Sequence, residues 1–131
     1  GVDLLKSARV LQTAYDDELG VTASFNLNLL RHLNRICGTN FDVRKFRHQA
    51  RFNAAKGRIE MWLVSRCTQC VEWPGGTLAL GEGDAILTEV SYKYAPQDFF
   101  RLLRSSGFAL AQHWFDAGSG FMVCHARSLT V

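Results

Sequence analysis

A run of alternating residues in the second half of the chain constrains its fold most strongly. Residues 86–94 read ILTEVSYKY, and this period-two pattern predicts a strand over residues 85–94. The alternation places Glu89 and Ser91 on one face of the strand, about 7 Å apart. A carboxylate and a hydroxyl at that spacing can bind one small polar ring, because the carboxylate accepts the proton of a ring N–H and the hydroxyl meets the opposite edge. Imidazole is such a ring.

Two other interpretations of this pair stay open. Polar residues alternate in the same way on any half-exposed strand, where they only face water. Lys93 shares the predicted face of Glu89 and Ser91, so it could neutralise Glu89 in a salt bridge, which would compete with ligand binding. The spacing alone therefore makes the pair a candidate site and does not assign it a ligand.

The remaining pattern predicts an α+β fold with a mainly antiparallel sheet and flanking helices. Glycine-rich turns separate the alternating segments. Pro96 suits the first turn of a helix, because its missing N–H would have no helical partner there. The predicted helices cover residues 6–18, 22–37 and 96–106, and the predicted strands cover residues 47–54, 58–70, 77–80, 85–94, 108–115 and 120–127.

The segment 22–37 carries the clearest helical pattern. Thr22 is the predicted N-cap, and Gly38 ends the helix. Asn26 and Asn28 lie near its start, where an amide caps the helix or faces water, and we assign them no function. Apolar residues at steps of four, four and three predict a buried face made of Phe25, Leu29, Leu33 and Ile36.

Composition indicates one folded domain. The chain has 131 residues, of which 47 % are hydrophobic and 21 % charged, and no apolar run reaches the roughly 18 residues of a membrane span. Its 15 basic and 12 acidic residues are dispersed along the chain, so nothing indicates a nucleic-acid partner. Four cysteines without a secreted framework predict a reduced, cytoplasmic protein. The lone C-x-x-C at Cys67 and Cys70 would point to opposite faces of a strand, which argues against a metal or redox site.

Motifs for several enzyme classes are missing from the sequence. The serines lack the G-x-S-x-G context of a hydrolase nucleophile, and the glycine-rich stretches match no phosphate loop or dinucleotide turn. The four histidines show no metal-ligand spacing. The chain starts at Gly1-Val2-Asp3-Leu4, which has no initiator methionine and reads like a buried strand entering a helix, so we expect a fragment of a longer protein.

Several motifs, taken in order along the chain, resemble one family. They lie at residues 15–17, 20–23, 25–28, 41–42, 46, 58–61, 88–91, 93 and 112–116 and read YDD, GVTA, FNLN, FD, F, RIEM, TEVS, K and QHWFD. Together they resemble the C-terminal part of the histidine Nα-methyltransferases. Members of that family use S-adenosylmethionine to trimethylate the α-amino group of histidine, which gives hercynine on the way to ergothioneine.

The resemblance implies a fold and a set of site residues. Residues 1–94 would be a substrate-recognition region with two N-terminal helices and a β-meander. Residues 95–131 would supply a helix and hairpin that complete a Rossmann-like methyltransferase sheet. Glu89 and Ser91 would hold the substrate imidazole, and Met61 would line the same pocket.

No part of the chain matches the family's glycine-rich loop, its acidic residue for the cofactor ribose, or its asparagine for the substrate amine. S-adenosylmethionine is therefore expected only in the full-length parent, and this fragment alone is expected to be inactive, with strand edges open to self-association. Two alternatives remain, namely a methyltransferase for another amine and a non-catalytic small-molecule binding module.

Overall fold

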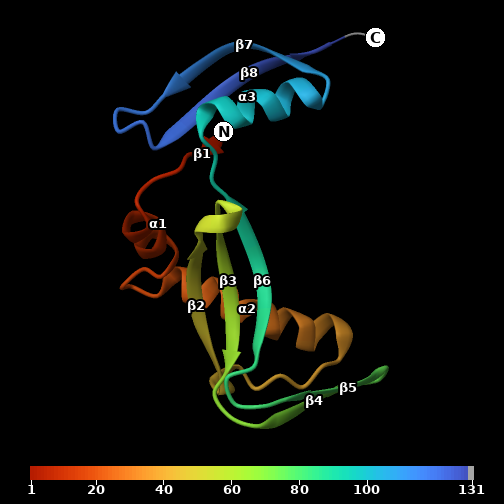
Figure 1. Cartoon of the computed structure of the whole chain (residues 1–131). Helices are drawn as coiled ribbons and strands as arrows, with labels where there is room; N and C mark the ends of the chain where they lie inside the picture. The colour runs from red at the N-terminus through yellow and green to blue at the C-terminus, as the bar shows by residue number, and fades with distance from the viewer. Residues whose placement is uncertain (130–131) are drawn as a thin grey trace.

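The structure is a computed structural model that describes residues 1–129. It is elongated, with a central sheet, a small hairpin at one end, and a second sheet with a helix at the other (Figure 1). Neighbouring strands within each sheet are antiparallel. The predicted α+β class with mainly antiparallel strands is therefore confirmed.

The central sheet has the order β2-β3-β6, formed by Phe46–Asn53, Arg58–Ser65 and Ala85–Tyr92. A short 3-10 helix, η2 (Ala54–Lys56), and Gly57 in the left-handed conformation join β2 to β3. A second 3-10 turn, η1 (Val43–Lys45), precedes β2.

The predicted strand over residues 58–70 is wrong in its length. β3 ends at Ser65, whose hydroxyl donates to the Cys67 carbonyl at 2.8 Å, and this contact stabilises a bend. The chain then forms a separate two-stranded hairpin of β4 (Gln69–Trp73) and β5 (Gly76–Leu80). The C-x-x-C pair thus does not lie within one strand.

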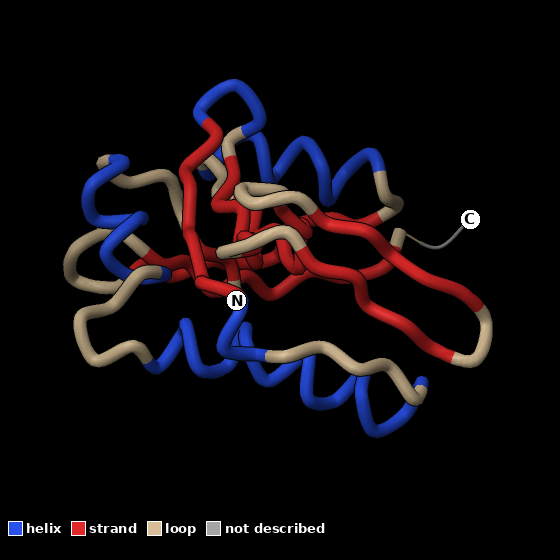
Figure 2. Tube along the Cα trace, turned by 90° about the horizontal axis from the view of Figure 1, so that it is seen from below, coloured by secondary structure: helices blue, strands red, loops and turns tan. Residues whose placement is uncertain are grey.

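Two helices, α1 (Ala8–Tyr15) and α2 (Val21–Cys37), pack against strands β2 and β3. Figure 2 shows the helices outside the strands when the molecule is viewed from below. Two clusters of buried residues fill this layer. One contains Leu30, Phe46, Leu63, Val71 and Leu80, and the other contains Leu11, Ile59 and Met61.

The predicted buried face of α2 is wrong. Phe25 is 67 % exposed and Ile36 is 58 % exposed, while Leu30 and Asn26 are the buried residues of this helix. Leu30 packs into the larger cluster, and Asn26 satisfies its amide through hydrogen bonds to the sheet. The apolar stripe therefore faces away from the core and leaves large hydrophobic side chains uncovered.

The predicted N-cap Thr22 is wrong, because Gly20 is the N-cap residue of α2 and Asp17 supplies the carboxylate at the helix start. The Asp17 carboxylate accepts hydrogen bonds from the backbone N–H groups of Thr22 and Val21, at 2.8 and 2.9 Å. These bonds, led by the one from Thr22, lower the pKa of Asp17 to about 2. The loop can bring Asp17 to the helix start because Gly20 adopts a left-handed φ of 69°.

Replacing Asp17 with alanine is expected to lower the melting temperature by a few degrees at pH 7 and to have little effect near pH 2. The folded-state pKa of about 2 lies below the ordinary value of 3.8. The capping contribution is therefore complete above pH 3.8 and disappears as the pH falls through 2. Thermal melts followed by circular dichroism across this range test the prediction. Asp16→Ala, which removes an exposed neighbouring carboxylate, is the control. A drop in melting temperature for Asp17→Ala that is equal at every pH would contradict the prediction.

The second sheet has the order β1-β8-β7, from Val2–Asp3, Phe121–Ser128 and Phe108–Phe115. β7 and β8 form the predicted final hairpin, and α3 (Pro96–Ser105) packs on β7. Its core consists of Val2, Leu4 and Met122, with partly buried Tyr94, Phe99, Phe100 and Cys124. The first residues of the chain thus share a sheet with the last strands.

The chain passes between the two sheets at two places that lie side by side. Leu4 and Tyr94 form a parallel bridge, and the Leu5 N–H donates to the Tyr94 carbonyl at 3.1 Å. The Tyr94 N–H donates in turn to the Asp3 carbonyl at 3.2 Å. These bonds place Lys93 at the junction between the central sheet and β1.

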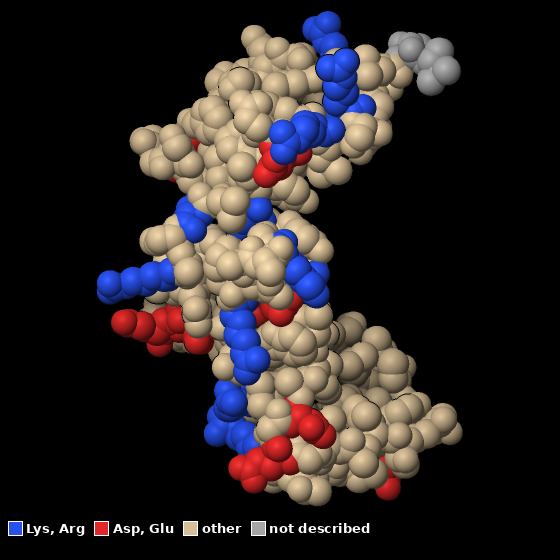
Figure 3. Space-filling model, in the orientation of Figure 1, with Lys and Arg blue, Asp and Glu red and all other residues tan. Residues whose placement is uncertain are grey.

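Charged side chains are scattered over the molecule. On the face shown in Figure 3, Lys and Arg lie from one end to the other, with Asp and Glu among them. None of the helices within residues 1–129 combines the length and the apolar character needed to cross a bilayer.

Candidate functional site

A β-bulge in β6 shapes the candidate site. Met61 of β3 pairs with Glu89, but the next residue, Trp62, pairs with Leu87, so Thr88 is the extra residue on β6. The Thr88 hydroxyl donates to the Met61 carbonyl at 2.9 Å and fixes the bulge. The bulge therefore interrupts the simple alternation immediately before Glu89.

Glu89 and Ser91 face the same side of the central sheet. Their partners on β3 are Met61 and Ile59, and cross-strand partners share a face. Met61 and Ile59 both pack against Leu11 of α1, which shows that this is the helix-covered side. The two polar side chains therefore lie on the side of the sheet that the helices cover, with Glu89 still exposed to solvent.

A cavity of about 270 Å³ lies between α2 and β6. Glu89 and Thr88 form its wall on the strand side. Glu89 is exposed, and no salt bridge to its carboxylate is found within residues 1–129. The helix side consists of Phe25, Asn26, Asn28, Leu29 and His32. A carboxylate that faces an aromatic, an amide and an imidazole suits a small polar ligand with an apolar body.

Asn26 anchors the helix side of this cavity. The side chain is 3 % exposed, and its Nδ2 donates to the His48 Nδ1 at 2.9 Å and to the Trp62 carbonyl at 3.2 Å. His48 Nε2 lies 2.8 Å from the Tyr15 carbonyl, so the ring donates there and accepts from Asn26. His48 thus holds the end of α1 and the start of α2 on the sheet.

Ser91 takes part in a polar network rather than lying on the cavity wall. Its Oγ accepts hydrogen bonds from the Tyr15 hydroxyl at 2.9 Å and from Lys93 Nζ at 2.7 Å. Lys93 also forms an ion pair with Asp3 at 2.7 Å. The alternative interpretation, a salt bridge between Lys93 and Glu89, is therefore wrong. The Glu89 carboxylate stays available for a ligand.

The carboxylate of Asp3 pairs with two ammonium groups, those of Lys6 and Lys93. Burial raises the pKa of this carboxyl, but the hydrogen bonds from Lys6 and Lys93 outweigh burial, so the pKa lies below its usual value. The charged form of Asp3 is thereby favoured, and it neutralises the buried ammonium of Lys93.

Met61 is largely buried, at 3 % exposure, and packs with Leu11 and Ile59. It is the cross-strand partner of Glu89, but its side chain is not among those that line the cavity. Of the three residues singled out in the sequence, Glu89 lies at the cavity, and Ser91 and Met61 share its face of the sheet. Their roles toward a ligand stay predictions.

The sequence reasoning missed the contribution of α2. Asn26, Asn28 and His32 line the cavity, although none of them was assigned a function. The signal that could have located them is the spacing of Phe25, Leu29 and His32, which share one helix face. No three His, Cys, Asp or Glu side chains within residues 1–129 lie close enough together to hold a metal ion.

Comparison with known proteins then identifies the family. A family model described as "Histidine-specific methyltransferase, SAM-dependent" matches residues 1–128. The chain belongs to this family. The resemblance that the ordered motifs indicated is thus confirmed, and it covers nearly the whole chain.

Two relatives are histidine N-alpha-methyltransferases. The protein of Mycolicibacterium smegmatis is 39 % identical over 123 residues, and that of Mycobacterium tuberculosis is 42 % identical over 123 residues. Each alignment covers 92 % of this chain and 38 % of the relative. The chain therefore spans well under half the length of these two histidine-specific methyltransferases.

Proposed function

We propose that this chain is the C-terminal, substrate-recognition part of an S-adenosylmethionine-dependent methyltransferase that methylates the α-amino group of histidine. The observation that carries the proposal is the Glu89 carboxylate at the cavity wall, which has no ion-pair partner within residues 1–129 and shares a sheet face with the Ser91 hydroxyl. Family membership supplies the reaction class.

A neutral imidazole offers one N–H donor and one acceptor nitrogen. The Glu89 carboxylate at the cavity wall would accept from the ring N–H. The Ser91 hydroxyl, which is not on the wall itself but is the next residue along β6 on the same face, would donate to the other nitrogen. A hydrogen bond to a charged group contributes roughly 1.5–3 kcal/mol, which corresponds to about ten- to hundredfold discrimination. An amino acid without a ring N–H would leave the Glu89 carboxylate without this bond.

The chain itself would supply orientation rather than the methyl group. Methyl transfer requires the amine nitrogen to lie in line with the transferred carbon, and holding the ring at its far end restricts where the amine can be. The cofactor would supply the reactive methyl group when bound.

Two cavities of the described residues, one between α3 and β7 and one beside Glu89, do not fit S-adenosylmethionine well. The one between α3 and β7, of about 380 Å³, has no acidic side chain for the ribose hydroxyls, because its lining is Phe100, Arg104, Phe108, Ala109, Leu110 and Leu129. The cavity beside Glu89 is smaller, and its one carboxylate is assigned to the substrate in this proposal. We therefore place the cofactor outside this chain and expect the chain alone to be inactive.

The two sheets would have different tasks in the complete enzyme. Residues 1–94 would recognise the substrate, and residues 95–131 would complete a Rossmann-like sheet. Trp114 and Phe115 on β7 and Phe121 on β8 are 43–52 % exposed, which fits a surface that further structure covers. Without that structure, the free edge of β7 would favour self-association of the chain.

The complete enzyme is expected to transfer methyl groups to the α-amine of histidine and to leave tryptophan and lysine essentially unmodified. Mass spectrometry of the products, with S-adenosylmethionine as the methyl donor, measures this directly. Tryptophan is the stringent comparison, because its indole N–H could also reach Glu89 while it lacks the acceptor nitrogen. Methylation of another amine, with no mass gain on histidine, would reject the proposed substrate. Binding of histidine without any methyl transfer would favour a non-catalytic module.

A further inference from the structure

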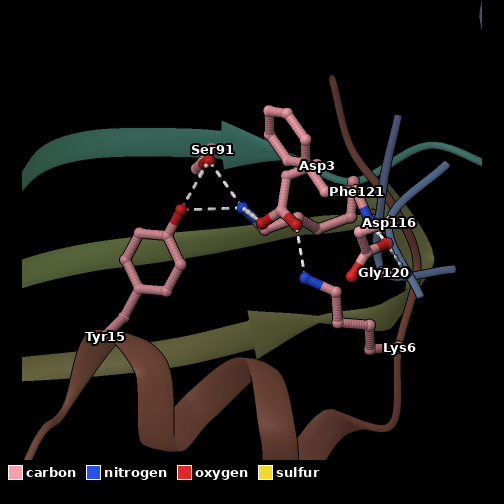
Figure 4. A network of polar contacts seen from close by, with 8 residues as sticks. Asp3, Lys6, Tyr15, Ser91, Asp116, Gly120 and Phe121 are labelled. Atoms are coloured by element: carbon pink, nitrogen blue, oxygen red, sulfur yellow. Dashed lines mark hydrogen bonds and ion pairs between the residues drawn. The ribbon is translucent and has the colours of Figure 1, made fainter. Parts of the chain in front are cut away.

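Each N–H donor of the Lys93 ammonium group has a partner among three neighbouring side chains. Its side chain is 0 % exposed, and Nζ lies 2.7 Å from Asp3 Oδ2, from Tyr15 Oη and from Ser91 Oγ. An ammonium has three N–H donors and no acceptor, so each donor has one partner. These partners come from three separate elements, β1, α1 and β6, and Figure 4 shows Asp3, Tyr15 and Ser91 converging on one point.

In the structure, the Tyr15 hydroxyl donates and the Ser91 hydroxyl accepts in the contact between them. Tyr15 Oη accepts from Lys93 and donates its own proton to Ser91 Oγ at 2.9 Å. Ser91 Oγ then accepts two hydrogen bonds, which occupy both of its lone pairs. No acceptor for the Ser91 proton is found within residues 1–129. With both lone pairs occupied in this way, the Ser91 hydroxyl has its own proton left to donate.

We propose that Lys93, neutralised by Asp3 and assisted by Tyr15, is a positioning residue that orients Ser91 as a hydrogen-bond donor and so selects substrate rings with an unprotonated acceptor nitrogen. The inference rests on the proposed function of Glu89 and Ser91. Glu89 accepts and Ser91 donates, so the pair is complementary to neutral imidazole. A ring with two N–H groups, such as imidazolium, would place a donor against the Ser91 proton.

The alternative is that Lys93 only joins the two sheets. Lys6 provides the matched comparison, because it also pairs with Asp3 but contacts neither Ser91 nor Tyr15. A purely structural role would lower stability, more for the buried Lys93 than for Lys6, and would leave the preference for a ring with an acceptor nitrogen unchanged in both variants. If Lys93 has a positioning role, only the Lys93 variant loses the preference for a ring with an acceptor nitrogen, and the Lys6 variant keeps it.

The test uses the complete enzyme and two substrates, histidine and 3-(pyrrol-2-yl)alanine, whose ring keeps an N–H but lacks the acceptor nitrogen. The quantity compared is the ratio of kcat/KM for the two substrates. The wild-type enzyme is expected to prefer histidine by roughly tenfold, the worth of one hydrogen bond. Lys93→Met is expected to lower this ratio several-fold, toward the value for Ser91→Ala, mainly through KM for histidine. Lys6→Met is expected to keep the wild-type ratio.

Tyr15→Phe provides a second measurement if Lys93→Met does not fold, because it removes one donor to Ser91 and leaves the Lys93–Asp3 pair intact. It is expected to lower the same ratio. The proposal is overturned if Lys93→Met, or Tyr15→Phe in its place, keeps the wild-type ratio, or if Ser91→Ala does not lower it. Failure of the proposed function is seen separately, since the wild-type enzyme would then not methylate histidine at all.

Discussion

Replacing Glu89 with glutamine in the complete enzyme is expected to raise the Kd for histidine by about ten- to a hundredfold. Glutamine keeps the size of the side chain and its carbonyl acceptor but removes the charge that strengthens the hydrogen bond to the ring N–H. The exposed carboxylate has no cationic partner within residues 1–129, so no network has to rearrange when the charge is lost. Isothermal titration calorimetry with histidine gives the Kd directly.

Glu82→Gln is the control for this change, because Glu82 is an exposed carboxylate in the turn before β6 and does not line the cavity. It is expected to leave the Kd within about twofold of the wild-type value. An unchanged Kd in Glu89→Gln would remove the proposed role of this residue. The outcome would leave family membership untouched, since that depends on the sequence comparison.

Replacing Leu63 with alanine is expected to reduce the free energy of unfolding by about 2–5 kcal/mol. Leu63 is 0 % exposed and lies in the cluster formed by Leu30, Phe46, Val71 and Leu80, where the helix layer and the β4–β5 hairpin meet the central sheet. Removing its side chain leaves a cavity with rigid walls, because neighbours on four different elements cannot all move inward. Urea denaturation followed by circular dichroism measures the change.

Leu78→Ala provides the comparison, since Leu78 is the same residue type on β5 but is 37 % exposed. It is expected to cost less than about 1 kcal/mol, because much of its surface is already in water. Equal losses in the two variants would show that the packing around Leu63 is not the main contribution of that residue to stability.

Local patterns predicted most elements because those elements depend on nearest neighbours in the chain. Alternation located β2 and β6, and Pro96 and Gly107 located the two ends of α3. The prediction of which face α2 buries was wrong for a physical reason. A hydrophobic stripe shows which side avoids water, but Phe25 and Leu29 border a cavity, and a buried amide at Asn26 replaces them on the sheet side.

The candidate site was predicted only in part. The shared face of Glu89 and Ser91 follows from alternation over two residues, which the bulge at Thr88 does not disturb because it lies before both. The partner of Lys93 could not be predicted, because Asp3 is 90 positions away and reaches it only through the bridge of Leu4 with Tyr94. The caps and cavity walls on α2 depend in the same way on tertiary contacts.

The paired connection between the sheets limits how the two halves can move. A single linker would let one half swivel freely about the other. Here two segments run alongside each other through residues 3–5 and 93–94 and are joined by backbone hydrogen bonds, so torsion would have to break that pairing (Figure 1). The paired backbone bonds therefore resist rotation of one half about the other, and the buried Lys93 ammonium adds side-chain bonds at the same place.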